Sequence, residues 1–78
     1  MDIVARRGRL LAVIEVKRRR DMATALAAVT ARQQRRITRA AQAFLARHIG
    51  LADLDLRFDV IAVLPYRLPR HIKDAWRP

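Results

Sequence analysis

Two apolar stretches dominate the pattern of hydrophobic and polar positions along the chain. Residues 9–17 are apolar on both alternating faces, which is typical of a central strand covered on both sides. Residues 57–64 form a second apolar run, with hydrophobic side chains at alternating positions, and they predict another strand. Pro65 ends this strand. A shorter strand is predicted at about residues 2–6, so the pattern predicts strands at about 2–6, 9–17 and 57–64.

The region between the second and third strands has a helical period. Thr30 and Gln33 have the spacing of a capping box, and the main helix is predicted over about residues 31–48, before Gly50. A shorter helix is predicted at residues 22–28, with Asp21 as its cap. The core-facing stripe of the main helix comprises Ile37, Ala41, Phe44, Leu45 and His48. Pro69 predicts a terminal turn or short helix over residues 70–76.

Arg7-Gly8 is expected to form a tight turn between the first two strands. In that register Arg6 pairs with Arg9, and Asp2 pairs with Val13. Asp2 then shares a face with Glu15 and Lys17, because alternate residues of a strand point the same way.

The order strand, strand, helix, strand predicts an α/β fold, a mixed sheet of about three strands with one long helix in a single domain over residues 1–78. One long helix covers only one face of such a sheet, whereas the second strand is apolar on both. We therefore expect either a partner copy, giving a homodimer, or a further piece of the chain to cover the other face.

Composition points to a polyanionic partner. The 78 residues carry a net charge of +10, mostly from arginine. Nucleic acid, DNA first, is the expected partner, and a merely basic soluble surface is the alternative. There is no cysteine, no apolar run near the roughly 20 residues of a membrane span, and no signal-peptide pattern at the N-terminus. We expect a cytoplasmic protein without a membrane partner.

The candidate chemistry lies at the end of the second strand. Glu15 and Lys17 share one face of a strand that is otherwise apolar, and burying such groups is costly unless they are paired or bind a metal. Asp2 and Glu15, with the carbonyl of Val16, offer the oxygen ligands that Mg²⁺ or Mn²⁺ prefers. Lys17 would contact the attacking water or the scissile phosphate. A structural ion pair between Glu15 and Lys17 is an equal alternative on the residues alone.

Arginines supply candidate phosphate contacts. Those singled out for nucleic-acid binding are Arg18, Arg32, Arg35, Arg36 and Arg39. The helical ones follow i, i+3, i+4 and i+7 opposite the core stripe, and a solvated helix face is the alternative. Asp59 is expected to pair with a nearby arginine. Tyr66 is a candidate for stacking on a base, and His71 has no assigned role.

These motifs resemble a known family. The order of the motifs resembles the core of the PD-(D/E)xK nucleases. Asp2 comes first, Glu15-Val16-Lys17 lies across a hairpin from it, and a helix follows. The YraN family of predicted bacterial endonucleases, similar to archaeal Holliday junction resolvases, is the nearer match. The blocks that carry the resemblance are Met1 to Arg6, Val13 to Arg18, Val29-Thr30 with Gln34 to Arg36, and Arg57 to Val63.

The resemblance implies a restriction-endonuclease-like core that hydrolyses DNA phosphodiesters with Mg²⁺ or Mn²⁺, at branched DNA. Asp2, Glu15 and Lys17 are the implied catalytic residues, and Asp2, Glu15 and Val16 hold the metal. It also implies that the family's N-terminal helix and first strand precede the position of Met1, so that this chain is truncated. The alternatives are a DNA- or RNA-binding module without catalysis, and an inactive truncated product.

Overall fold

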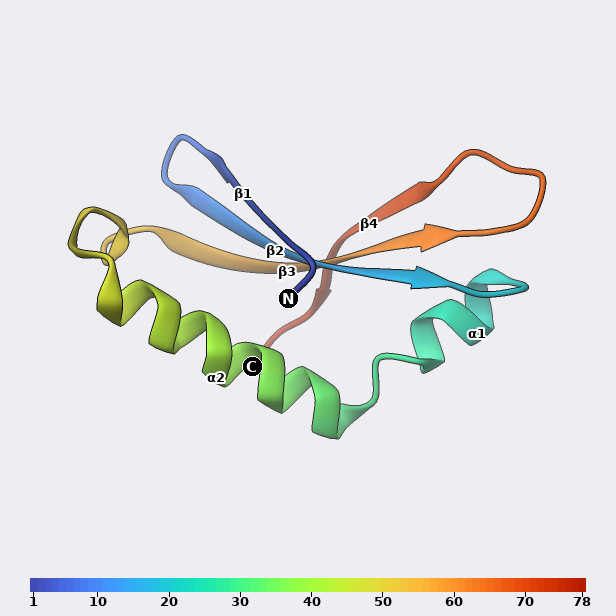
Figure 1. The fold of residues 1–78 in the computed structure, drawn as a ribbon, viewed down its shortest axis with the longest axis horizontal. Coiled ribbons are helices and arrows are strands. Elements are labelled where there is room, and N and C mark those ends of the chain that lie inside the picture. The colour runs from blue at the N-terminus through green and yellow to red at the C-terminus, as the bar shows by residue number, and fades with distance from the viewer.

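The computed structural model describes all residues 1–78 and forms a four-stranded mixed sheet with two α-helices on one side (Figure 1). The strands are ordered β1-β2-β3-β4 across the sheet. In chain order the elements are β1 (Ile3–Arg7), β2 (Leu10–Arg18), α1 (Met22–Ala27), α2 (Ala31–Arg47), the 3₁₀ turn η1 (Ile49–Leu51), β3 (Asp55–Val63) and β4 (Arg70–Trp76). The predicted α/β class is therefore confirmed, with four strands where about three were expected.

The hairpin between β1 and β2 has a different register from the predicted one. Arg7 pairs with Leu10 and Val4 with Val13, so Gly8-Arg9 forms the turn. Gly8 has φ 59°, and glycine at the first central position is typical of a type II′ hairpin turn. The prediction placed glycine at the second turn position, which shifted the pairing by two residues. A shift of two leaves every side chain on its predicted face.

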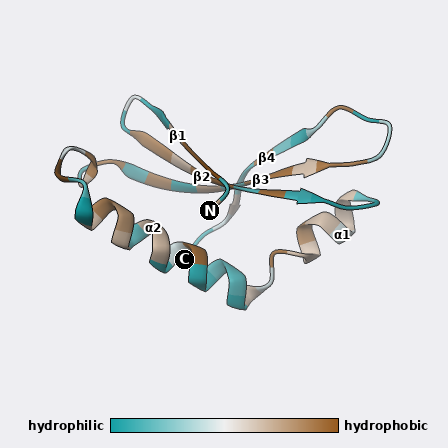
Figure 2. Ribbon diagram, in the orientation of Figure 1, coloured by the Kyte–Doolittle hydropathy of each residue, from teal (hydrophilic) through white to brown (hydrophobic).

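The helical connection between β2 and β3 follows the predicted caps closely. The Asp21 carboxylate accepts a hydrogen bond from the Thr24 N–H (2.8 Å) at the start of α1. Thr30 Oγ1 accepts one from the Gln33 N–H (3.2 Å) at the start of α2. Along α2, hydrophilic and hydrophobic residues alternate within the turns, as in a helix with one polar and one apolar face (Figure 2). This crossover makes β2 and β3 parallel neighbours.

The prediction of a terminal turn or helix over residues 70–76 is wrong, because these residues form β4, antiparallel to β3. Val60 pairs with Ile72 and Phe58 with Trp76, so β4 contains extra residues at an irregularity between these pairs. Ile72, Ala75 and Trp76 all contact the core as a result. Their i, i+3, i+4 spacing imitates a helix although the segment is a bulged strand.

The core lies between the sheet and the two helices. Under α2 the buried cluster contains Val13, Val29, Ile37, Ala41, Phe58, Val60 and Trp76. Phe58 and Trp76 stack with ring centroids 5.2 Å apart across β3 and β4. A smaller cluster of Ala25, Ala62 and Leu64 lies under α1. The long parallel strands thus present one continuous face to both helices.

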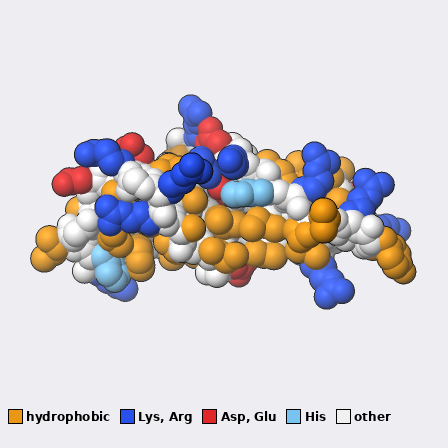
Figure 3. Space-filling view, turned by 90° about the horizontal axis from the view of Figure 1, so that it is seen from above, with side chains coloured by type: hydrophobic (Ala, Val, Ile, Leu, Met, Phe, Trp, Pro, Cys, Tyr) orange, Lys and Arg blue, Asp and Glu red, His pale blue; other side chains and the backbone are white.

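The opposite face of the sheet carries no helix. Seen from that side, apolar side chains run across the middle of the molecule with Lys, Arg and His groups around them (Figure 3). Ala12 and Ile14 of β2 lie on this face but are only 6% exposed, and longer side chains such as Arg57 and His71 line the same shallow pocket. The expected cover on both faces of β2 is therefore not supplied by any helix or strand of the structure.

Candidate functional site

Glu15 and Lys17 lie near the end of β2, on the face that the helices cover. Glu15 pairs with Val60 and Lys17 with Ala62, and both of these β3 residues are buried. Glu15 itself is only 6% exposed, and its Oε2 lies 3.6 Å from Lys17 Nζ. The predicted sharing of one strand face is confirmed, and the two charges form an ion pair at the margin of the core.

A second cation and an amide complete the surroundings of this pair. The Met1 ammonium nitrogen lies 3.3 Å from Glu15 Oε1. With its amide oxygen turned towards β2, Gln33 accepts a hydrogen bond from Lys17 Nζ (3.1 Å) and donates one to Ala28 O (2.9 Å). Gln33 was predicted only as a capping-box residue. Its contact with Lys17 arises from the packing of α2 against β2, which the sequence pattern does not encode.

A pocket of about 330 Å³ opens beside Glu15, between Met1 and the first half of α2. Its lining includes Gln33 and Arg36, and the Arg36 guanidinium makes no ion pair in the structure. An anion that entered this pocket would meet the Arg36 guanidinium and would also face the Glu15 carboxylate, whereas Lys17 does not line the pocket. The pocket therefore gives solvent access to a carboxylate that is otherwise buried.

Asp2 lies beside the same stretch of β2 but binds its backbone. Asp2 Oδ2 accepts a hydrogen bond from the Val16 N–H (2.8 Å), and the Asp2 N–H donates to Ile14 O (3.2 Å). This contact uses the N–H of Val16, whereas the predicted metal site uses its carbonyl oxygen. Asp2 is exposed and makes no ion pair with Lys17 or the Met1 ammonium.

The oxygen donors near Glu15 are of the kind that a hard divalent cation prefers. Mg²⁺ in proteins is usually held by one or two carboxylates together with waters, and Asp2 and Glu15 provide two carboxylates. No group of three or more His, Cys, Asp or Glu side chains is arranged to hold a metal. Both carboxylate oxygens of Glu15 are paired with cations in the structure, Oε1 with the Met1 ammonium and Oε2 with Lys17 Nζ.

The structure divides the predicted arginine set into separate surfaces. Arg36 faces the pocket beside Glu15, whereas Arg35 and Arg39 line a different pocket of about 480 Å³ with Trp76 and Arg77. Arg18 lies with Arg19 and Arg20 at the end of β2. Arg32 is exposed near the start of α2 and lines none of these pockets. All five are exposed, and none forms an ion pair with an acid.

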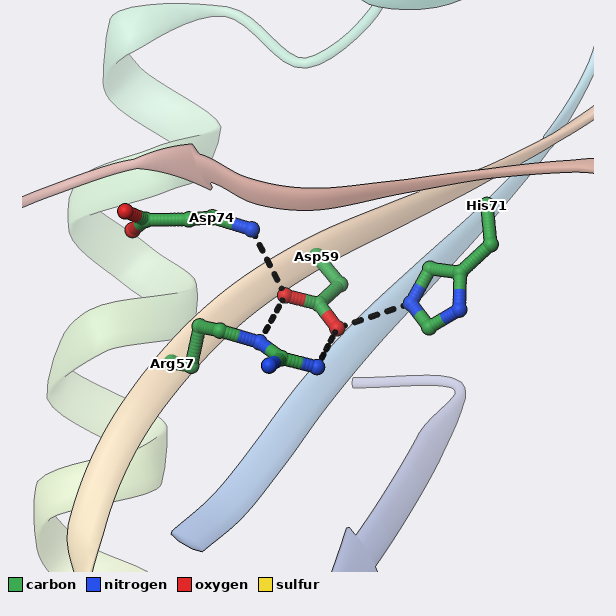
Figure 4. A network of polar contacts seen from close by, with 4 residues as sticks. All are labelled: Arg57, Asp59, His71 and Asp74. Atoms are coloured by element: carbon green, nitrogen blue, oxygen red, sulfur yellow. Dashed lines mark hydrogen bonds and ion pairs between the residues drawn. The ribbon is translucent and has the colours of Figure 1, made fainter.

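The most enclosed charged group of the molecule is Asp59, on the face away from the helices (Figure 4). Its carboxylate is fully buried and accepts two hydrogen bonds of 2.8 Å from Arg57 Nε and Nη2. It also accepts one from the Asp74 N–H (2.9 Å) and lies 2.8 Å from His71 Nε2. Burial raises the pKa of Asp59, but the bonds from Arg57, Asp74 and His71 outweigh it and hold that pKa below its usual value.

The predicted pairing of Asp59 with an arginine is confirmed, because Arg57 and Asp59 are two residues apart on one strand and point to the same face. His71 was given no role from the sequence. Its contact with Asp59 depends on β4, which the sequence pattern did not predict. Every oxygen of Asp59 is taken by hydrogen bonds that tie β3 to β4, so this cluster stabilises the sheet.

Neither helix combines the length with the apolar character needed to cross a lipid bilayer.

Comparison with known proteins places these features in a family. Residues 1–63 match the model of the uncharacterised protein family UPF0102. A UPF0102 protein of Parvibaculum lavamentivorans is 56% identical over 78 residues, which is 100% of this chain and 59% of that protein. A UPF0102 protein of Paramagnetospirillum magneticum is 54% identical over 77 residues, covering 99% of this chain and 60% of the relative. A third, from Bartonella quintana, is 53% identical over 72 residues, covering 92% and 59% of the two chains.

The chain therefore spans about three fifths of the length of the curated relatives it matches. The match extends over Asp2, β1, β2, both helices and β3, so it includes Glu15, Lys17 and the α2 arginines. This chain belongs to the UPF0102 family, also known as the YraN family.

Proposed function

We propose that this chain carries the core of a metal-dependent endonuclease that hydrolyses DNA phosphodiesters, with a restriction-endonuclease-like arrangement of β2, α2 and β3. The observation that carries the proposal is the pairing of buried Glu15 with Lys17 beside a pocket lined by Arg36. The pocket brings the Glu15 carboxylate and the Arg36 guanidinium to one opening, and the Lys17 amine pairs with that carboxylate. These are groups that phosphodiester hydrolysis uses. The resemblance to PD-(D/E)xK nucleases supports the same roles.

In this proposal Asp2, Glu15 and the Val16 carbonyl hold one Mg²⁺ or Mn²⁺ ion. When bound, the ion neutralises phosphate charge and activates a water molecule. Lys17 lies 3.6 Å from Glu15 and places its ammonium against the scissile phosphate, where charge develops during the reaction. Arg36 contacts the neighbouring phosphate, since it lines the pocket and has no acidic partner. Branched DNA is the proposed substrate on the strength of the family resemblance.

The test is Mn²⁺-dependent cleavage of a labelled four-way DNA junction beside a linear duplex of the same sequence. Lys17→Ala should lower cleavage about a hundredfold or more, because it removes a charge that stabilises the transition state. The chain has one other lysine, the exposed Lys73 of β4, so Lys73→Ala is the matched control and should cleave normally. Equal cleavage by the wild type and Lys17→Ala would overturn the proposal.

A second candidate function is DNA or RNA binding without catalysis. It is favoured by the exposed arginines of α2, which have no acidic partner, and by the net charge of +10. Salt-dependent binding that survives Lys17→Ala, with no cleavage at any Mn²⁺ concentration, would favour this candidate. Because the chain covers three fifths of its relatives, the same assay on a complete family member distinguishes an inactive fragment from a family without nuclease activity.

A further inference from the structure

A second basic surface lies at the end of the sheet next to α1, where the β2–α1 turn meets the β3–β4 turn (Figure 1). Parallel pairing places Arg18 opposite Val63, and the Arg19 N–H donates to Val63 O (3.2 Å). Beyond this contact is a hollow of about 590 Å³, which we call the Tyr66 hollow. It is lined by Arg18, Arg19, Arg20, Val63, Leu64, Pro65 and Tyr66.

Tyr66 has an unusual backbone conformation. It follows Pro65 in the turn and has φ 58°, a left-handed conformation that in β-turns favours glycine or asparagine. A bulky side chain in this conformation costs free energy, and such outliers gather at functional sites. Tyr66 is nevertheless fully exposed, at 105% of its reference area, and its hydroxyl makes no side-chain hydrogen bond. The ring gains no contact within the chain that would offset the cost.

The three arginines of the hollow are also free to bind a ligand. None of them forms an ion pair, and the only side-chain hydrogen bond among them runs from Arg19 Nη1 to Arg18 O (2.8 Å). Asp21, the next residue along the chain, uses its carboxylate to cap α1 through the Thr24 N–H. The hollow therefore combines several unpaired guanidinium groups with one exposed aromatic ring.

An aromatic face next to several cations matches one ligand chemistry well. An unpaired nucleotide presents a flat base that stacks on an aromatic ring, with phosphates a few ångströms away for arginine. Duplex DNA keeps its base faces stacked and would use only the arginines. An acidic peptide would likewise leave the ring without a partner.

We propose that the Tyr66 hollow binds an unpaired nucleotide segment of a nucleic acid, with a base on Tyr66 and phosphates on Arg18, Arg19 and Arg20. Arg18 follows Lys17 in β2 but points to the opposite face, so the Tyr66 hollow is a surface separate from the pocket beside Glu15. The inference deepens the proposed function and rests on it for the identity of the polymer. It names an unpaired strand as part of the substrate.

The test measures binding without metal, so that cleavage plays no part. Fluorescence anisotropy would compare a labelled oligothymidylate of roughly ten nucleotides with a duplex of equal length. Tyr66→Asn should weaken binding of the single strand roughly tenfold, the loss expected for one stacked base, and leave duplex binding unchanged. Asparagine tolerates a positive φ, so this variant should fold at least as well as the wild type.

Two variants provide the controls. Tyr66→Phe keeps the ring and should bind the single strand as the wild type does. Leu68→Asn changes another exposed side chain of the same turn that does not line the hollow, and it should also bind normally. The inference is overturned if the wild type does not prefer the single strand over the duplex, or if Tyr66→Asn and Leu68→Asn bind it equally well.

An anionic membrane surface is the main competing ligand for arginines beside an exposed tyrosine and leucine. Sedimentation with vesicles of phosphatidylcholine and phosphatidylserine would detect it. Vesicle binding that depends on Tyr66, with unchanged binding of the single strand, would overturn the inference. Failure of the nuclease proposal would give a different result. Cleavage would then be insensitive to Lys17→Ala, while the binding of single strands would still depend on Tyr66.

Discussion

The Asp59 carboxylate accepts a hydrogen bond of 2.9 Å from the backbone N–H of Asp74, a residue of the neighbouring strand with φ 55°. Asp74 lies within the irregular stretch of β4, where the ladder with β3 is interrupted. A backbone N–H that has lost its ladder partner is costly to bury unless another acceptor replaces it. Asp59 provides that acceptor, so one buried side chain determines how β4 bends to bring Trp76 onto the core.

Replacing Asp59 should therefore destabilise the whole sheet. Asp59→Ala leaves Arg57 and the Asp74 N–H without their buried acceptor, and we expect a loss of about 2–3 kcal/mol in the free energy of unfolding. Urea denaturation followed by Trp76 fluorescence measures it. Asp55→Asn, at an exposed position at the start of the same strand, is the control and should change stability by less than about 0.5 kcal/mol. Equal stability of the two variants would contradict the structural role.

Stability should also fall in acid because of Asp59. The pKa of Asp59 is lower in the folded chain than its ordinary value of 3.8, so the unfolded chain binds more protons as the pH falls. The stabilisation is present above about pH 4 and is lost as the pH falls through the folded pKa. Urea midpoints from about pH 6 down to about pH 3 would show the decline. The decline should be shallower in Asp59→Asn, and an equal slope would contradict the assignment.

The β1–β2 turn offers a matched pair of glycine substitutions. A Cβ at Gly8 or at Gly50 would meet no atom within 4 Å, but only Gly8 has a positive φ, at 59°. Gly8→Ala should cost about 1 kcal/mol through backbone strain alone. Gly50→Ala should be neutral or slightly stabilising, because it reduces the entropy of the unfolded chain. Thermal or urea unfolding of both variants measures the difference, and similar costs would show that φ at Gly8 is not the cause.

The N-cap of α2 is a second local determinant of stability. Thr30→Ala removes the acceptor of the Gln33 N–H, and we expect a loss of about 1 kcal/mol. Thr30→Ser keeps the hydroxyl and should restore most of that loss. Circular dichroism during urea titration follows both variants. A serine variant as unstable as the alanine variant would mean that the threonine methyl group, and not the cap, is responsible.

Salt dependence distinguishes the α2 arginines that contact phosphates. Arg36→Gln should lower the slope of log affinity against log salt by about 1 for DNA, because it removes one phosphate contact. Arg47→Gln, at the far end of α2, is the charge-matched control and should leave the slope unchanged. Anisotropy titrations over a range of salt concentrations give both slopes. A similar change in both would indicate a response to net charge and no defined contact at Arg36.

Several elements were predictable because their determinants are local. The apolar run of β2, the alternation of β3 and the capped amphipathic period of α2 each predict their element within a few residues. The sharing of one strand face by Glu15 and Lys17 follows from the period of two along any strand. The pairing of Arg57 with Asp59 follows from the same rule.

What the sequence by itself determined is therefore the α/β class, the central strands, the main helix and the Glu15–Lys17 pair. Only the tertiary structure decided the rest. Because of the bulge in β4, its core-facing residues have the spacing of a helix. Ile72 and Trp76 therefore cannot be assigned to a strand until β3 provides their partners. Likewise, Gln33 meets Lys17, and His71 meets Asp59, only after the sheet has formed and α2 has packed on it. The physical reason is that local periods encode which face a side chain occupies, whereas a contact between elements depends on how the whole chain buries its apolar surface.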